Sequence, residues 1–159
     1  MLSGYNSKEI NVQPFTLLFF VIMLSGCTAT YKQSLLSEPS TKLDKRKAVI
    51  IATPINGFYE NKKYSTSGRM TAQAVRSSFS QHSSNISVST DCTDLACFQS
   101  LNTNNYDYYV IPEILHWEDR ATEWSGISDK VEVKISIYEY PNWKELASAI
   151  INGKSNFNS

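Results

Sequence analysis

The residue types most suited to chemistry gather in one short segment, residues 116–130. His116 lies next to Glu118 and Asp119, a combination of residue types found in general acid–base catalysis. Neighbouring residues of a strand point to opposite faces, so His116 and Trp117 cannot act on the same ligand. The histidine is therefore better interpreted as a surface or packed residue than as a catalytic one.

Aromatic and charged side chains make the same segment a candidate partner-binding loop, formed by Trp117, Arg120, Glu123 and Trp124. Tryptophan and arginine offer a large contact area at low entropic cost, which is typical of protein hot spots and sugar-binding sites. In a competing interpretation, Trp117 packs on the helices, Trp124 covers the sheet edge, and Arg120 pairs with Glu118 or Glu123. The sequence leaves both interpretations open.

Two cysteines five residues apart, Cys92 and Cys97, predict a structural disulfide in an oxidising compartment. Residues at this spacing within one α-helix point about 140° apart, so the two cysteines cannot be both helical and bridged. We expect Thr93 to be the N-cap of a helix that leaves Cys92 outside. A metal site would need more ligands, and His82 and His116 are both distant in sequence.

Composition and motifs exclude several classes of function. The chain has 15 Lys plus Arg and 15 Asp plus Glu, so no overall field favours nucleic acid. It contains no phosphate-binding glycine-rich loop, no nucleophile elbow and no zinc-ligand spacing. We expect a protein that is not an enzyme and has no cofactor and no metal.

An apolar run over residues 15–24 predicts a secretory signal segment. It has the length of a signal-peptide apolar region and is too short for a membrane-spanning helix. The sequence Leu-Ser-Gly-Cys at residues 24–27 resembles the lipobox of bacterial lipoproteins. This resemblance implies cleavage before Cys27, whose thiol then carries diacylglycerol, and a final product with three acyl chains, palmitate among them.

The lipobox divides the chain into three expected parts. Residues 1–26 are the signal peptide, residues 27–46 are the lipidated N-terminus and a flexible polar tether, and residues 47–159 are a periplasmic domain. By analogy with bacterial sorting rules, Thr28 in place of an aspartate favours the outer membrane, with the domain facing the periplasm. The membrane is then a partner through the lipid on Cys27.

A basic cluster lies near the end of this tether and consists of Lys42, Lys45, Arg46 and Lys47. Such a cluster can contact anionic lipid or cell-wall carboxylates. The interpretation that we favour is simpler: a solvated linker end that leads into the first strand of the domain.

Hydrophobic periodicity predicts an α+β layered domain. The expected elements, in order, are a strand over 48–53, a helix over 68–80, a short strand over 86–88, a helix over 94–101, and strands over 106–117, 130–140 and 146–151. This order is β-α-β-α-β-β-β, which predicts a mixed sheet with helices packed on it. Ser67 or Thr66 is the expected N-cap of the first helix. Pro112 indicates an edge position or a bulge.

Several segments together resemble a family of uncharacterised proteobacterial lipoproteins that is defined by a domain of unknown function. They are residues 108–112, 131–138 and 153–155, and most specifically the Trp-Glu-Asp-Arg-x-Thr-Glu-Trp-Ser-Gly run at 117–126. The resemblance implies a lipid-anchored envelope protein without assigned catalysis. Members continue past the last strand into a C-terminal helix, so we expect the domain to be C-terminally truncated, with apolar surface exposed in its place.

Three hypotheses for function follow. The first is a non-catalytic accessory that binds an envelope protein through the loop from Trp117 to Lys130. The second is a lipoprotein that binds peptidoglycan or a surface glycan with the same loop. The third, an envelope hydrolase, requires a carboxylate pair such as Glu118 and Glu123 in a cleft.

Overall fold

The computed structural model describes residues 28–39, 41–101, 104–120 and 127–156. The prediction for the signal peptide and Cys27 lies outside these residues. The strands are β1 (Thr28–Ser37), β2 (Val49–Ala52), β3 (Phe58–Tyr59), β4 (Lys62–Lys63), β5 (Ile86–Ser89), β6 (Tyr108–Glu118), β7 (Lys130–Glu139) and β8 (Lys144–Asn156), and the helices are α2 (Ser67–Ser80) and α3 (Leu95–Leu101).

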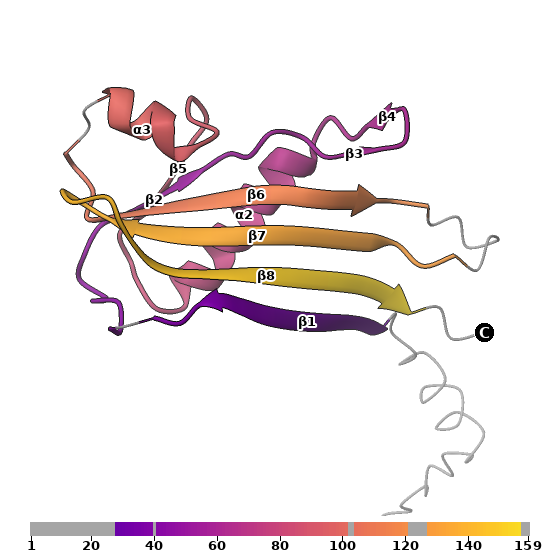
Figure 1. Cartoon of the computed structure of the whole chain (residues 1–159), viewed down its shortest axis with the longest axis horizontal. Coiled ribbons are helices and arrows are strands. Elements are labelled where there is room, and N and C mark those ends of the chain that lie inside the picture. Colours follow the sequence, from indigo (N-terminus) through magenta and orange to yellow (C-terminus); the bar gives the residue numbers. More distant parts are fainter. Residues whose placement is uncertain (1–27, 40, 102–103, 121–126, 157–159) are drawn as a thin grey trace, which may run out of the picture.

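Six strands form one mixed sheet in the order β1-β8-β7-β6-β2-β5 (Figure 1). Strand β2 runs parallel to both of its neighbours, β5 and β6, whereas β6, β7, β8 and β1 are antiparallel in succession. The predicted class and the predicted element order are both confirmed. Two additions were not predicted: strand β1 and the hairpin formed by β3 and β4.

Strand β1 lies where the sequence predicted part of a flexible tether, and the structure corrects that prediction. Residues 28–37 pair along their length with β8 at the edge of the sheet. The side chains at residues 29–36 are all exposed, so the strand is held by backbone hydrogen bonds and not by burial. Its apolar residues Ala29, Tyr31 and Leu35 alternate only weakly with polar ones, because Gln33 interrupts the pattern, and periodicity therefore did not predict a strand here.

The hydrophobic core is concentrated in the half of the sheet that contains β2 and β5. Strand β2 is buried at every position, as its continuous apolar run predicts. On one face Val49 and Ile51 pack with Val75 of α2. On the other face Ile50 packs with Phe98 of α3. We call this half, with α3 and the turn at residues 140–143, the closed end.

Strands β6, β7, β8 and β1 continue well beyond β2, and we call their far half the open end. It comprises the hairpin at residues 58–63 and residues 28–33, 114–120, 127–133 and 151–156. The open end is on the right in Figure 1, where β1 begins and where β6 ends. Its exposed surface is mostly polar, in contrast to the core of the closed end.

Helix α2 begins one residue before the predicted start, and its N-terminus is held differently from the prediction. Thr66 is at the N-cap position but makes no side-chain capping bond. Instead, Asn56 of the preceding loop accepts a hydrogen bond from the Gly68 backbone N–H, at 2.9 Å. A Cβ at Gly68 would lie 2.1 Å from the Pro54 carbonyl oxygen, so this close approach requires glycine.

The predicted disulfide joins Cys92 and Cys97, with a Cα–Cα distance of 5.4 Å. Helix α3 begins at Leu95, so Cys92 lies outside the helix as the geometric argument required. The capping residue is not Thr93, however. The carboxylate of Asp94 accepts the Cys97 backbone N–H at 2.8 Å.

Pro112 lies in an interior strand, at a point where that strand is locally an edge. Strand β2 stops pairing with β6 at Val110, so at Pro112 only β7 remains as a neighbour. A bulge follows between Ile114 and His116. Both positions are therefore compatible with the missing N–H of proline.

Candidate functional site

The candidate site lies at the open end, where β6 finishes. Of the four predicted binding-loop residues, the structure places Trp117 and Arg120 there, whereas Glu123 and Trp124 lie outside the described residues. The loop is therefore described at its two ends, residues 117–120 and 127–130.

A buried carboxylate organises the first end of the loop. The Glu118 side chain is only 5 % exposed, and its carboxylate forms an ion pair with Arg120, whose Nε lies 2.5 Å from one carboxylate oxygen. His116 Nε2 lies 3.1 Å from the other carboxylate oxygen. Burying a charge is costly unless it is paired and hydrogen-bonded, and here Arg120 supplies the pairing. The predicted pairing of Arg120 with Glu118 is confirmed.

The hairpin of β3 and β4 completes this group of side chains. The Tyr59 hydroxyl contacts the Arg120 guanidinium, which lies over the Tyr59 ring at 4.6 Å from its centroid. The same ring meets His116 edge to face, with centroids 5.5 Å apart. Tyr64 donates a hydrogen bond to the Asp119 backbone carbonyl at 3.2 Å. We call Tyr59, His116, Glu118 and Arg120 the Glu118 cluster.

Trp117 points to the opposite face of the sheet from this cluster. It is half-buried against the backbone of Gly57, where an added Cβ would lie 2.5 Å from the Trp117 Cβ. Contact with so small a residue indicates a packing role. For Trp117, the structure favours the competing interpretation over the binding one.

Asp129 organises the second end of the loop. Its carboxylate accepts the Arg120 backbone N–H at 2.8 Å, which ties one end of the loop to the other. Its own backbone N–H donates to Ser155 Oγ of β8 at 2.8 Å. The two ends of the loop are therefore fixed to each other and to the sheet.

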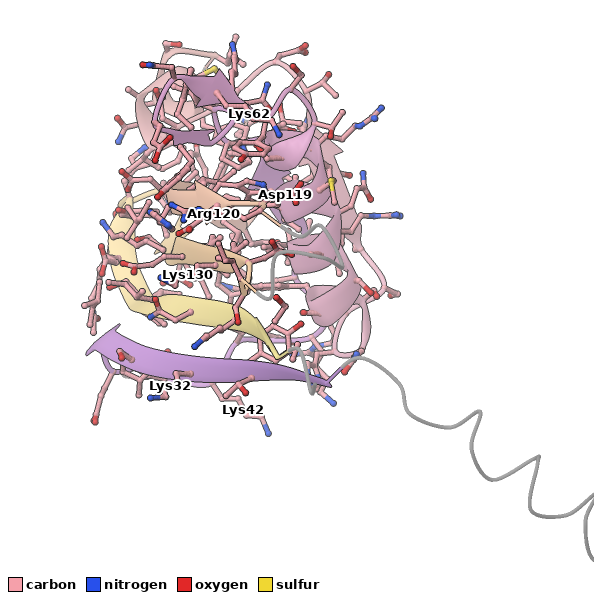
Figure 2. The ribbon with its side chains drawn as sticks, turned by 90° about the vertical axis from the view of Figure 1, so that its right-hand side faces the viewer. Lys32, Lys42, Lys62, Asp119, Arg120 and Lys130 are labelled. Atoms are coloured by element: carbon pink, nitrogen blue, oxygen red, sulfur yellow. A yellow bond between two sulfur atoms is a disulfide. The ribbon has the colours of Figure 1, made fainter. Side chains whose placement is uncertain are left out.

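A shallow hollow of about 540 Å³ lies beside the cluster on the same face of the sheet. It is lined by Thr30, Lys32, His116, Lys130, Val131, Glu132, Asn152, Gly153 and Lys154. Figure 2 views the molecule from the open end, with Lys62, Arg120, Lys130 and Lys32 following one another from top to bottom. Three lysines and one glutamate give this hollow a basic character.

The charged side chains of this site are engaged with one another. The described residues contain no group of His, Cys, Asp and Glu side chains arranged to hold a metal ion. The carboxylate of Glu118 is occupied by Arg120, and its neighbour His116 is turned toward it. Within the described ranges, neither α2 nor α3 is long and apolar enough to cross a membrane.

The basic cluster at residues 42–47 lies away from this site, and two of its members are paired within the protein. Arg46 contacts Asp44 at 2.8 Å, and its hydrogen bonds lower the pKa of Asp44 to about 2. Lys47 contacts Glu139 at 2.9 Å, and this hydrogen bond raises the pKa of Lys47. These pairs engage Arg46 and Lys47 within the protein, whereas Lys42 and Lys45 are exposed.

Sequence reasoning missed the burial of Glu118 and the whole contribution of the hairpin. The sequence did contain a signal for the pairing of Glu118, because His116 and Glu118 are two residues apart in a strand and so share a face. The hairpin gave no comparable signal. Tyr59 reaches the cluster from a position 61 residues before Arg120.

Comparison with known structures shows the fold. PelC from Paraburkholderia phytofirmans, solved as a dodecamer, has 11% sequence identity and a TM-score of 0.57, with 82% of this chain and 83% of that chain covered. A second PelC dodecamer from the same organism has 12% sequence identity and a TM-score of 0.55, with 82% of each chain covered. The lipoprotein GNA1162 from Neisseria meningitidis has 14% sequence identity and a TM-score of 0.43, with 70% of this chain and 86% of that chain covered.

Comparison with curated proteins finds no match. The model of a domain of unknown function, DUF4823, matches residues 41–159. The match covers most of the chain and confirms the resemblance to a family defined by a domain of unknown function. The chain belongs to the DUF4823 family.

Proposed function

We propose that this protein is a lipid-anchored lipoprotein of the bacterial cell envelope, and that its α+β domain binds a protein partner without catalysing a reaction. The anchor is Cys27, at the end of the lipobox-like sequence of residues 24–27. The membrane is the outer membrane, because Thr28 and not an aspartate follows Cys27, and the domain faces the periplasm.

The observation that carries the proposed binding role is the way the loop at residues 117–130 is mounted. Arg120 and Asp129 join its ends, and Glu118 fixes Arg120 against the hairpin. Side chains held by such contacts lose less conformational entropy on binding. Glu118, Arg120 and Asp129 do not belong to the hydrophobic core, so their contacts are not needed to fill the interior of the domain.

A non-catalytic role agrees with the state of the carboxylates. Among the described residues, Glu118 is the most buried carboxylate, and it is engaged by Arg120 and His116. A general acid or base needs access to its substrate within hydrogen-bond reach. The Glu118 cluster is better suited to positioning the loop.

In-cell photo-crosslinking of the lipidated protein tests this proposal. A photo-reactive amino acid replaces Lys62 on the hairpin or Trp124 in the loop, and the matched control carries it at Leu101, an exposed position on α3 at the closed end. We expect a discrete protein adduct from positions 62 and 124 and none from position 101. A glycan adduct would identify the protein as a glycan-binding lipoprotein instead. Equal labelling from all three positions would contradict the proposal.

Self-association is a second candidate, favoured by the edge of the sheet. Strand β1 is an edge strand of the six-stranded sheet, and its exposed side chains include those of Tyr31, which is 73% exposed, and Leu35, which is 54% exposed. Such edges pair readily with another strand, and PelC, which shares this fold, was solved as a dodecamer. Sedimentation of the lipidated protein in detergent tests this: an oligomer that Leu35→Lys dissociates supports it, and a monomer at every concentration excludes it.

A further inference from the structure

The start of β1 determines how close the folded domain lies to its anchor. The strand begins at Thr28, the residue directly after Cys27, and it pairs at once with the end of β8. Consecutive Cα atoms are about 3.8 Å apart. If Cys27 carries the lipid, as proposed above, the sheet therefore begins at the membrane surface with no intervening linker, and the open end is the end that meets the bilayer.

Three lysines lie on one face of the sheet within reach of this point. Lys130 and Lys154 occupy the same cross-strand row as Thr30, two residues from the start of β1. Lys32 lies on the same face, two residues further along β1 from Thr28 than this row. At a rise of about 3.3 Å per residue, these rows are roughly 7 Å and 13 Å from Thr28 along the strand, and the long lysine side chains shorten that gap.

The three ammonium groups are available for an external partner. All three side chains are exposed, and among the described residues none forms an ion pair. Among the described residues that line the hollow, Glu132 is the one carboxylate. The nearby carboxylate of Glu118 is buried and neutralised by Arg120. The hollow therefore presents net positive charge toward the side from which the chain leaves for its anchor.

We propose that this hollow binds the anionic lipid headgroups of the membrane that holds Cys27, so that the domain stands with its open end against the bilayer. The proposal rests on the lipid anchoring proposed above. Lysines near an anionic surface are attracted to it within about one Debye length, roughly 8 Å at physiological salt. The anchor keeps Lys130 and Lys154 within that range, and the long side chain of Lys32 brings its ammonium group close to it, so even a weak attraction orients the domain.

Amine footprinting of the acylated protein in lipid vesicles tests the proposal. Vesicles of one part phosphatidylglycerol to two parts phosphatidylcholine are compared with vesicles of phosphatidylcholine alone, and mass spectrometry measures the acetylation rate of each lysine. We expect Lys32, Lys130 and Lys154 to react at least about fivefold more slowly on the anionic vesicles, because an attraction of about 1 kcal/mol per lysine favours the docked orientation by at least that factor. Lys45 and Lys144, exposed lysines that do not line the hollow, provide the internal control and should not change.

Two results would overturn the proposal. Equal rates on both vesicle types would show that the hollow does not contact anionic lipid. Protection by inorganic phosphate without vesicles, at equal strength, would show a site for small anions instead of a membrane surface.

Charge variants provide a second readout. The triple variant Lys32→Gln, Lys130→Gln, Lys154→Gln is compared with Lys42→Gln, Lys45→Gln, Lys144→Gln, for binding of the unacylated protein to the anionic vesicles. We expect the first to lose on the order of a hundredfold in partition coefficient and the second to lose much less. Equal losses would overturn the proposal. Intact mass of the protein from cells reports acylation of Cys27 separately, so failure of the anchor and failure of the hollow are distinguishable.

Discussion

The two ends of the sheet are built on different principles. At the closed end, β2 is covered on both faces, and Tyr109 is fully buried among Phe98, Tyr106, Tyr140 and Trp143. At the open end, the same long strands carry lysines, a buried glutamate and an arginine that links a hairpin to a loop. The difference indicates that burial at the closed end supplies most of the stability of the fold, and the open end is the part to which we assign the proposed recognition.

The largest expected effect is at the closed end, for Tyr109→Ala. Its ring is 0% exposed and contacts four other aromatic rings, so its removal leaves a large cavity. We expect a loss of roughly 3–5 kcal/mol in the free energy of unfolding, measured by urea denaturation. Tyr109→Phe keeps the ring and serves as the control. A Tyr109→Ala protein as stable as the parent would remove the distinction between the two ends.

The second-largest loss of stability is expected on removal of the disulfide. Replacing both Cys92 and Cys97 by alanine opens a short loop, for which we expect a loss of about 2 kcal/mol in the free energy of unfolding. Because α3 belongs to the closed end, this loss should appear in global unfolding. The parent protein under reducing conditions should show the same shift. No shift in either case would mean that the bridge adds nothing to the closed end.

A smaller and more local effect is expected for Glu118→Gln. The substitution keeps the shape of the side chain but removes the charge that holds Arg120, with an expected loss of about 1.5 kcal/mol. Amide hydrogen exchange should accelerate in the hairpin at residues 58–63 and stay unchanged in β2. The control is Glu113→Gln, an exposed residue whose oxygen lies 4.0 Å from Lys134 Nζ, for which we expect almost no change. Faster exchange throughout β2 would show that the Glu118 cluster supports the core as well.

The smallest expected effect concerns Asp44, whose pKa is lowered to about 2 by hydrogen bonds from Arg46. A carboxyl group with a lowered pKa stabilises the folded state above its ordinary pKa of 3.8, and this contribution is lost as the pH falls toward 2. NMR titration should therefore find the Asp44 carboxyl still ionised at pH 3, and Arg46→Ala should return its pKa toward 3.8. A normal pKa in the parent protein would contradict the internal pairing of this basic cluster.

Most of the closed end could be predicted from the sequence, because burial leaves a periodic pattern. The apolar run of β2, the stripe of α2 and the alternation of β7 each indicated the correct element. The position of Cys92 outside α3 followed from helix geometry alone. In each case the determining interactions lie within one short segment.

The open end was harder to predict because its structure depends on contacts that leave no local pattern. Strand β1 is exposed and carries a mixture of polar and apolar side chains, and its backbone pairing with β8 defines it. Strands β3 and β4 have two residues each, too few for any period. The burial of Glu118 requires Arg120 and the distant Tyr59 together.

Hydrogen exchange of the lipidated protein in native envelope membranes, compared with the same protein in detergent, tests the central claim most directly. If the open end is the recognition surface, amide exchange in the membranes should slow at residues 58–63, 127–132 and 152–155. Exchange in β2 and α3 should be the same in both media. Slower exchange at the closed end alone, or no difference between membranes and detergent at the open end, would contradict the assignment of recognition to that end.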